Sequence, residues 1–166
     1  MSGPTGPLER VRASFGEQGL MRLLGVRVVE AGEGYCTIEL PFSEGVTQQK
    51  RYFHGAAIGA VGDNAGGYAA LTLAPPDREV LTVEYKVNFL APARGERRRS
   101  AVTTSPRATS LFVCKAEVSA VTGGRGDTLR SRVADRLALS GTGLIWRASG
   151  GPVMRPVAWA SGSINV

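Results

Sequence analysis

The sequence has very little from which a metal or redox centre could be built. Its 166 residues include only two cysteines, Cys36 and Cys114, and one histidine, His54. Three such widely spaced side chains cannot form a four-ligand zinc site, and the two cysteines are not arranged as a CxxC redox pair. We therefore expect no metal site, and two free thiols in a reducing compartment. No organic cofactor is expected either.

Long apolar runs are also missing. No uncharged stretch reaches the roughly 18–20 apolar residues of a membrane-spanning helix, and the first 19 residues lack the apolar core of a signal peptide. We therefore expect a cytoplasmic protein without a membrane partner. The length fits one domain, and 43% hydrophobic and 20% charged residues are typical of a globular chain.

Basic charge is distributed unevenly along the chain. Residues 1–93 carry 8 basic and 10 acidic residues, whereas residues 94–166 carry 12 and 4, so the second part supplies the net charge of +6. A basic nucleic-acid-binding protein is therefore the alternative from another functional class. However, Arg94–Arg107 contains no Phe, Tyr or Trp on which bases could stack. We expect no nucleic-acid partner.

Hydrophobic periodicity predicts helices that are separated from a run of strands. Predicted helices cover Pro7–Leu24 and His54–Ala74, and predicted strands cover Val26–Glu30, Tyr35–Phe42, Glu79–Leu90, Arg94–Thr104 and Leu111–Val121. The polar segment Ser43–Tyr52 is predicted to be a loop. The first two strands are predicted to form a hairpin, and apolar side chains alternate along Tyr35–Phe42, Glu79–Leu90 and Leu111–Val121 so that they share one face of each strand. This order favours an α+β fold with an antiparallel sheet packed on one helix.

The segment His54–Ala74 is the most informative part of the chain. It contains five glycines, each of which costs a helix about 1 kcal/mol relative to alanine. A glycine-rich loop is one interpretation. A helical stripe of apolar residues favours a buried helix instead, which another element approaches closely. The members of this stripe are Ile58, Val61, Ala65, Tyr68 and Leu71.

The motifs that follow resemble one known family. The pattern starts with His54-Gly55-Ala56, continues with Asp63 and ends with Phe89-Leu90-Ala91-Pro92-Ala93. It is similar to the hotdog-fold acyl-CoA thioesterases, and more narrowly to the PaaI-like group of the 4-hydroxybenzoyl-CoA thioesterase superfamily. Family members have a second glycine in place of the alanine, and many have asparagine in place of Gln48. The resemblance covers about residues 20–121. It implies a hotdog fold, an antiparallel sheet wrapped around one long central helix.

The residues themselves indicate how such a site could be assembled. The start of the long helix offers free backbone N–H groups, and Gly55 has no Cβ to block a carbonyl oxygen, so it is a candidate oxyanion hole. Asp63 lies eight residues further on, which is roughly 12 Å of helix rise. One copy of the helix cannot bring the two together. A two-fold pair of helices could, and the family resemblance also implies a site shared by two chains.

The resemblance implies a role for each candidate residue. Asp63 would act as a general base on water or as a nucleophile, and the sequence does not choose between these roles. Gln48 would hold the water or the thioester, and Thr82 would hydrogen-bond the same water. Asn64 is a further candidate for substrate binding. His54 is also among the catalytic candidates. It is expected to fix the junction between the loop and the helix rather than to act as a base.

The function implied is hydrolysis of an acyl-CoA thioester to a free acid and coenzyme A. Expected partners are the acyl-CoA substrate and further copies of the chain, as a homodimer or a dimer of dimers. The basic run that starts at Arg97 could contact the phosphates of coenzyme A, or it could be a solvated strand edge. A non-hydrolytic acyl-CoA-binding protein or a dehydratase-like protein of the same fold is the alternative, the latter with His54 as its base.

The end of the chain departs from the family pattern. Residues 1–122 are predicted to form the hotdog thioesterase-like domain, with residues 1–24 as an N-terminal helix, whereas 123–166 form an atypical segment. A turn is predicted at Gly123–Asp127, and the closing strand of the sheet is not recognisable. Two explanations remain open: a divergent extension, or a translated frameshift, with a second and compensated one at 97–110. Under the frameshift, the final strand would be missing or poorly formed.

Overall fold

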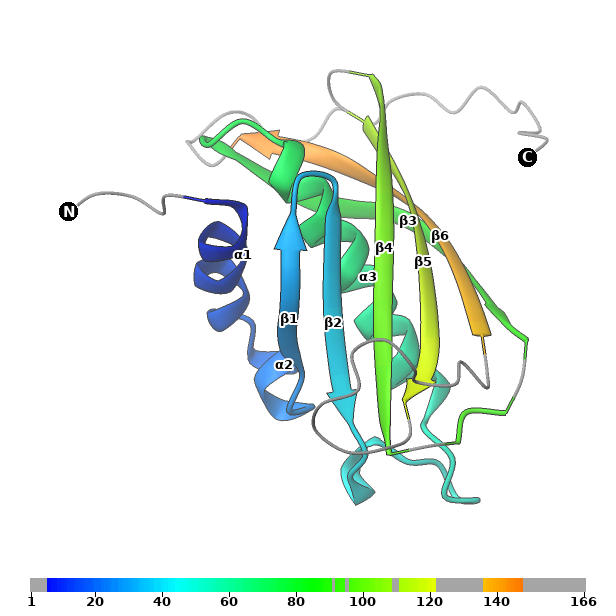
Figure 1. The fold of residues 1–166 in the computed structure, drawn as a ribbon. Helices are drawn as coiled ribbons and strands as arrows, with labels where there is room; N and C mark the ends of the chain where they lie inside the picture. Colours follow the sequence, from blue (N-terminus) through cyan, green and yellow to red (C-terminus); the bar gives the residue numbers. More distant parts are fainter. Residues whose placement is uncertain (1–5, 91, 95, 109–110, 122–135, 148–166) are drawn as a thin grey trace.

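Six antiparallel strands curve around one long helix, α3 (Gly55–Leu73), as Figure 1 shows. The structure is a computed structural model that describes residues 6–90, 92–94, 96–108, 111–121 and 136–147. The strands are β1 (Arg27–Gly32), β2 (Tyr35–Pro41), β3 (Arg78–Phe89), β4 (Arg97–Ala108), β5 (Leu111–Val121) and β6 (Arg136–Arg147). Their order across the sheet is β1-β2-β4-β5-β6-β3. The predicted α+β class, with a sheet around one central helix, is confirmed.

The glycines of α3 let the sheet approach the helix backbone. A Cβ placed on Gly66 would lie 3.4 Å from the Cβ of Cys114 in β5. The Cys114 thiol also donates a hydrogen bond to the Gly66 carbonyl oxygen, at 3.3 Å. All five residues of the predicted apolar stripe are at most 5% exposed. The predicted close approach is therefore confirmed, and packing against the sheet offsets the low helix propensity of glycine.

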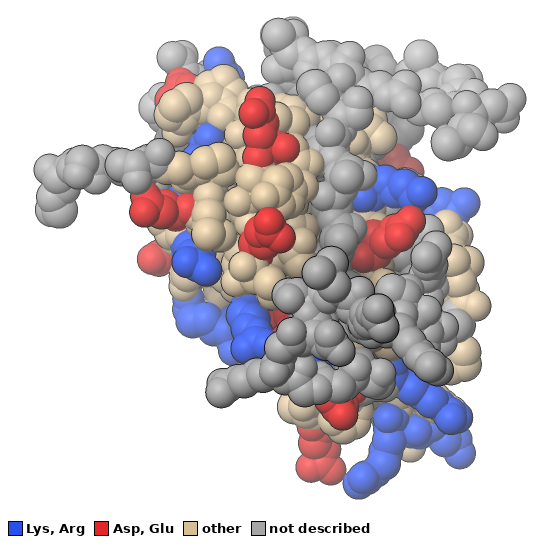
Figure 2. All heavy atoms as spheres, viewed as in Figure 1, with Lys and Arg blue, Asp and Glu red and all other residues tan. Residues whose placement is uncertain are grey.

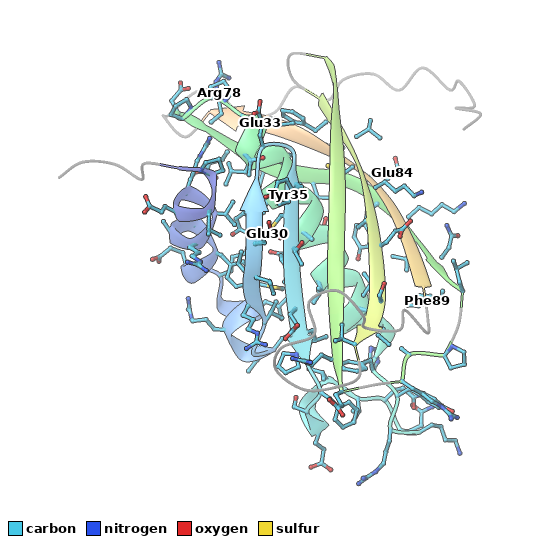
Figure 3. All side chains as sticks on the ribbon, in the orientation of Figure 1. Glu30, Glu33, Tyr35, Arg78, Glu84 and Phe89 are labelled. Carbon is cyan, nitrogen blue, oxygen red and sulfur yellow. The ribbon has the colours of Figure 1, made fainter. Side chains whose placement is uncertain are left out.

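Among the strand side chains that the structure describes, those of β2 and β5 supply most of the sheet side of the core. Their apolar side chains alternate as predicted, because successive residues of a strand point to opposite faces. The buried members are Cys36, Ile38 and Leu40 in β2, and Phe112, Cys114, Ala116, Val118 and Ala120 in β5. The predicted β1–β2 hairpin is also present, and across it the Tyr35 hydroxyl donates to Glu30 Oε1 at 3.1 Å (Figure 3).

Strand β3 lies at the edge of the sheet and contains one irregularity. Thr82 pairs with Gly143 of β6, and Glu84 pairs with the neighbouring Thr142. Val83 is left between them as an extra residue. This arrangement is a β-bulge, which bends a strand and re-aims its side chains.

The bulge changes which residues of β3 face the helix. Before it, Thr82 hydrogen-bonds to Asp63 of α3. After it, the ring of Phe89, at the end of β3 in Figure 3, lies 3.0 Å from where a Cβ of Gly55 would stand. Thr82 faces α3 before the bulge and Phe89 faces it after the bulge. Because these two residues are seven positions apart, a regular strand would place them on opposite faces. The uninterrupted alternation predicted for this strand is therefore wrong.

The N-terminal helical segment is broken, although the sequence predicts one helix over Pro7–Leu24. Helix α1 (Pro7–Gly16) ends in a glycine and α2 (Gly19–Leu23) begins with one. Gln18, between them, has an extended backbone with φ −78° and ψ 109°. The two glycines lower the cost of leaving the helix at this point, because glycine is a poor helix former.

Helix α1 is anchored to the connection between α3 and β3. The guanidinium group of Arg10 donates to the carbonyl oxygens of Ala74, Pro75 and Arg78, at 2.7, 2.9 and 2.9 Å. Val11, the next residue of α1, is fully buried in the core. These contacts hold α1 beside α3, so that residues of α1 can form part of a site between the two helices.

The closing strand, which is not recognisable in the sequence, is present in the structure. Strand β6 pairs with β5 on one side and with β3 on the other. Glycines at 141 and 143 interrupt any alternation of apolar residues in its sequence. The strand can still form, because strand pairing uses backbone N–H and C=O groups, and β6 has a neighbouring strand on each side to bond with. The predicted turn Gly123–Asp127 and residues 148–166 lie outside the described residues. Strand β4 ends at Ala108 rather than Thr104, and the predicted loop Ser43–Tyr52 contains a short 3-10 helix, Glu44–Val46.

Candidate active site

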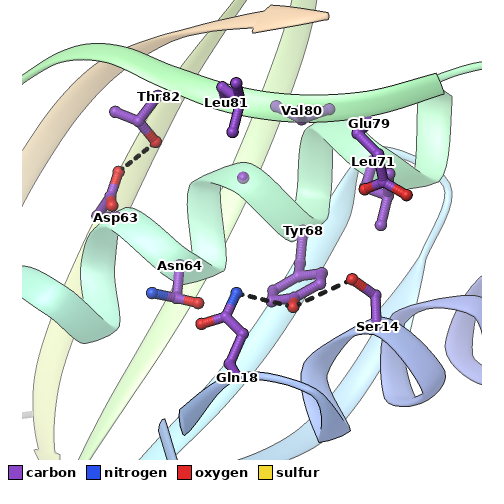
Figure 4. Close-up of a pocket in the computed structure, with 11 residues that line it drawn as sticks. Ser14, Gln18, Asp63, Asn64, Tyr68, Leu71, Glu79, Val80, Leu81 and Thr82 are labelled. Atoms are coloured by element: carbon purple, nitrogen blue, oxygen red, sulfur yellow. Dashed lines mark hydrogen bonds between the residues drawn. The ribbon is translucent and has the colours of Figure 1, made fainter. Parts of the chain in front are cut away.

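A carboxylate and a hydroxyl group meet on the wall of a cavity of about 550 Å³. Thr82 Oγ1 donates a hydrogen bond to Asp63 Oδ1 at 2.6 Å, as Figure 4 shows. The cavity is lined by α3, by the first half of β3 and by the C-terminal end of α1 and the residues that follow it. Its lining residues are Ser14, Gln18, Asp63, Asn64, Gly67, Tyr68, Leu71, Glu79, Val80, Leu81 and Thr82.

The environment of Asp63 favours proton acceptance. Burial raises the pKa of Asp63 above its ordinary value, and the hydrogen bond from Thr82 acts in the opposite direction. A carboxylate with a raised pKa is a stronger base than an ordinary surface aspartate. The bond from Thr82 also restricts the orientation of the carboxylate through its Oδ1 atom.

The first turn of α3 lies at the other end of the helix from the cavity. His54 Nδ1 accepts a hydrogen bond from the Ala56 N–H at 3.0 Å, and the His54 N–H donates to the Val46 carbonyl oxygen at 2.8 Å. His54 thus caps the helix and joins it to the preceding loop. The Gly55 N–H has no acceptor among the described residues.

Gly55 and Asp63 do not form one site within a single chain. Asp63 lines the cavity, and Gly55 does not. The eight residues between them correspond to roughly 12 Å of helix rise. The folded chain therefore keeps Gly55 and Asp63 apart along α3, as expected from the sequence.

Two other predicted site residues, Gln48 and Arg97, interact with nearby residues outside the cavity. Gln48 Oε1 accepts a hydrogen bond from the Lys50 N–H inside the loop. Arg97 Nη1 lies 3.7 Å from Oε1 of Glu39, a carboxylate that is 1% exposed and also pairs with Arg27. Neither Gln48 nor Arg97 lines the cavity.

Asn64 does line the cavity, next to Asp63 in the sequence. Its Nδ2 donates to the Ala60 carbonyl oxygen at 3.1 Å, one turn earlier in α3. Its Oδ1 is enclosed and has no hydrogen-bond donor among the described residues. The structure therefore brings together Asp63, Asn64 and Thr82 from the predicted set.

Sequence reasoning missed the side of the cavity that α1 forms. Gln18 Nε2 donates to the Tyr68 hydroxyl at 2.9 Å, and Ser14 Oγ lies 3.4 Å from the same hydroxyl (Figure 4). Tyr68 was assigned to the apolar stripe, and its ring is indeed buried. The spacing of Asn64 and Tyr68, four residues apart and hence on one helix face, was the signal that could have placed both in the site.

Other kinds of site find less support in the described part of the chain. No group of three or more side chains there could hold a metal ion. No helix there is long and apolar enough to cross a membrane. Acidic and basic side chains are interspersed over the face in Figure 2, where Lys and Arg gather at the lower end.

Comparison with known proteins gives consistent results. The sequence pattern of the thioesterase superfamily matches residues 51–126. A protein of Halobacterium salinarum named "Putative esterase VNG_1336C" is 30% identical over 117 residues, which cover 68% of this chain and 76% of that protein. The crystal structure of a thioesterase family protein from Silicibacter pomeroyi is 32% identical, with a TM-score of 0.76 over 86% of this chain and 99% of that one.

A third likeness concerns the fold alone. The Escherichia coli PaaI protein, from the phenylacetic acid degradation operon, is 13% identical, with a TM-score of 0.71 over 90% of this chain and 98% of that one. Together with the two relatives above, this likeness confirms the predicted hotdog arrangement.

Proposed function

The chain belongs to the thioesterase superfamily, and we propose that it hydrolyses acyl-CoA thioesters to a free acid and coenzyme A. The observation that carries this proposal is the hydrogen-bonded pair of Asp63 and Thr82 on the wall of a 550 Å³ cavity. A volume of this size suits an acyl group. Asp63 Oδ2 takes a proton from a water molecule, whose oxygen attacks the thioester carbonyl carbon. The C–S bond then breaks, and the thiolate of coenzyme A leaves.

A second role for Asp63 is compatible with the same geometry. Its carboxylate could attack the carbonyl carbon directly and form a mixed anhydride, which water then hydrolyses. Both routes release the same products. Both need Asp63 in its ionised form, and both need a group that stabilises the negative charge on the carbonyl oxygen.

The oxyanion donor in this proposal is the Gly55 N–H of a second copy of the chain. A two-fold axis would place Gly55 of one chain beside Asp63 of the other and create two equivalent sites. Two features of β3 support such a pairing. It is an edge strand, which offers unpaired backbone groups to a partner, and it exposes large apolar side chains. The exposed residues are Leu81, Val83, Tyr85 and Phe89, together with Leu90 directly after the strand. A homodimer and a dimer of dimers both meet this requirement.

The same pairing would bring other candidates into the site. Gln48 belongs to the loop that His54 joins to the start of α3, so it would enter together with Gly55 and contact the water or the thioester. Asn64 would bind the acyl group. Arg97 is the candidate for the phosphates of coenzyme A, although its guanidinium lies beside the buried Glu39.

A matched pair of aspartate variants tests the proposal. Asp63→Asn removes the base and is expected to lower kcat for a responsive acyl-CoA by about 10²-fold or more, measured as release of free thiol across aryl and medium-chain substrates. Asp77→Asn makes the same change at an exposed site outside the cavity and should leave kcat unchanged. Near-normal turnover by Asp63→Asn would contradict the assignment. A larger loss in His54→Ala than in Asp63→Asn would favour dehydratase-like chemistry.

A further inference from the structure

The cavity carries negative charge without a matching positive charge. Two of its lining residues, Asp63 and Glu79, are acidic, and none of the described residues that line it is Lys or Arg. Asp63 belongs to the proposed chemistry. Glu79 stands on β3, three residues before Thr82, and the chemistry proposed above does not use it.

Most of the side-chain donor groups of the cavity wall already have an acceptor, although the amides of Gln18 and Asn64 each keep a second N–H. The Thr82 hydroxyl donates to Asp63, and Gln18 Nε2 donates to the Tyr68 hydroxyl. That hydroxyl in turn lies within hydrogen-bond distance of Ser14 Oγ, so one of the two donates to the other. A ligand in the cavity therefore meets few free donors.

The cavity wall also has acceptors that lack a donor. Asn64 Oδ1 is enclosed without a donor, and a buried acceptor in this state costs free energy until a donor reaches it. Asn64 lines the cavity, so a rotation of its amide, which gives up the bond from Nδ2 to Ala60, would present this oxygen to a ligand. The Glu79 carboxylate offers two further acceptor atoms at the β3 side of the same cavity (Figure 4).

We propose that the cavity selects acyl groups whose far end carries a hydrogen-bond donor, uncharged or cationic, and rejects acyl groups that end in a carboxylate. Asn64 and Glu79 are the specificity-determining residues. The proposal rests on the thioesterase activity proposed above and deepens it. A terminal hydroxyl or ammonium group would donate to Asn64 Oδ1 or Glu79. A terminal carboxylate would be repelled by Glu79 and Asp63 and would meet no Lys or Arg among the described residues of the lining.

Four substrates of equal carbon count test this selectivity: hexanoyl-, ω-hydroxyhexanoyl-, ω-aminohexanoyl- and adipoyl-CoA. We expect kcat/KM to be about tenfold higher for the hydroxyl and amino substrates than for hexanoyl-CoA, as for one added hydrogen bond. Adipoyl-CoA should be hydrolysed least efficiently. The four differ only at the far end, so the thioester chemistry is the same in each.

Two variants assign the effect to residues. Asn64→Leu should reduce kcat/KM for the hydroxyl substrate toward that for hexanoyl-CoA, and should lower it less for the amino substrate, which keeps its attraction to Glu79. Glu79→Gln should raise kcat/KM for adipoyl-CoA about threefold, as for a solvent-screened charge, and lower it for the amino substrate without changing the hydroxyl substrate. Glu84→Gln, on the same strand but outside the cavity lining, is the matched control and should change no ratio. Glu79 is exposed, so its variant should keep the fold.

Binding to the Asp63→Asn variant separates failure of the inference from failure of the proposed activity. Isothermal titration with the same four compounds should give the same order of affinities without any turnover. Equal kcat/KM for all four substrates would overturn the inference and leave the thioesterase function standing. If the wild-type protein hydrolyses none of them, the calorimetric order decides: the expected order supports the selectivity, and equal affinities overturn it.

Discussion

Apolar and polar residues alternate in a similar way along strands β5 and β3, yet the two strands have different roles in the fold. β5 pairs with β6 without interruption from Leu111 to Ser119, and all its residues that point toward the helix are buried. β3 pairs with the opposite side of β6, but its ladder is interrupted at Val83 and most of its side chains are exposed. The regular strand builds the core. The interrupted strand brings Thr82 to Asp63 and forms one edge of the sheet.

Deletion of one residue from the regular strand should have the largest effect. Removing Glu117 from β5 would shift the alternation by one and move part of its buried face to the other side. Each large apolar side chain that leaves the core costs roughly 1.5–3 kcal/mol, against a typical total stability of about 5–15 kcal/mol. We expect no cooperative thermal unfolding transition by circular dichroism. A transition close to that of the wild-type protein would show that β5 does not set the core.

The Thr82 hydroxyl should matter for chemistry but not for folding. Thr82→Val keeps the shape and removes the hydrogen bond to Asp63, so kcat should fall about threefold to tenfold. That bond lowers the pKa of Asp63, so its loss raises the pKa further. The acid limb of the pH–rate profile should therefore move to higher pH, because Asp63 must be ionised to act. An unchanged profile would separate Thr82 from the proposed chemistry.

Deletion at the bulge should have the smallest effect. Without Val83, the pairs Thr82–Gly143 and Glu84–Thr142 become consecutive rungs of a regular ladder, and Thr82 still faces Asp63. We expect a change in unfolding free energy within about 1 kcal/mol, measured by urea denaturation, and retained activity. A loss as severe as that from the Glu117 deletion would mean that β3 and β5 are equally intolerant, and the contrast between them would fail.

The contrast between the strands also explains what the sequence could predict. Burial of the β5 face and of the α3 stripe follows from local periodicity, and both predictions are confirmed. The bulge in β3 depends on its register with β6, more than 50 residues away in the chain. Val83 continues the apolar alternation, so nothing local marks it as the extra residue.

The residues of the cavity divide in the same way, into those that the local sequence could predict and those that contacts distant in the chain bring into place. The motif predicted Asp63 and Thr82, and the structure brings them within hydrogen-bond distance. Ser14 and Gln18 could not be placed, because their position depends on the break between α1 and α2 and on the contacts of Arg10. The roles of Gln48, Gly55 and Arg97 stay predictions, since each depends on a second chain or on the bound substrate.

The central claim is that two chains build each site, and complementation between inactive variants tests it most directly. Asp63→Asn loses the base. Gly55→Val places a side chain over the N–H and against the ring of Phe89. In a mixed dimer, one site would carry both lesions and the other would be native. After verified subunit exchange at equal amounts, half of the dimers are mixed, so about a quarter of native activity should return. Recovery near zero would contradict the claim and would mean that each site lies within one chain.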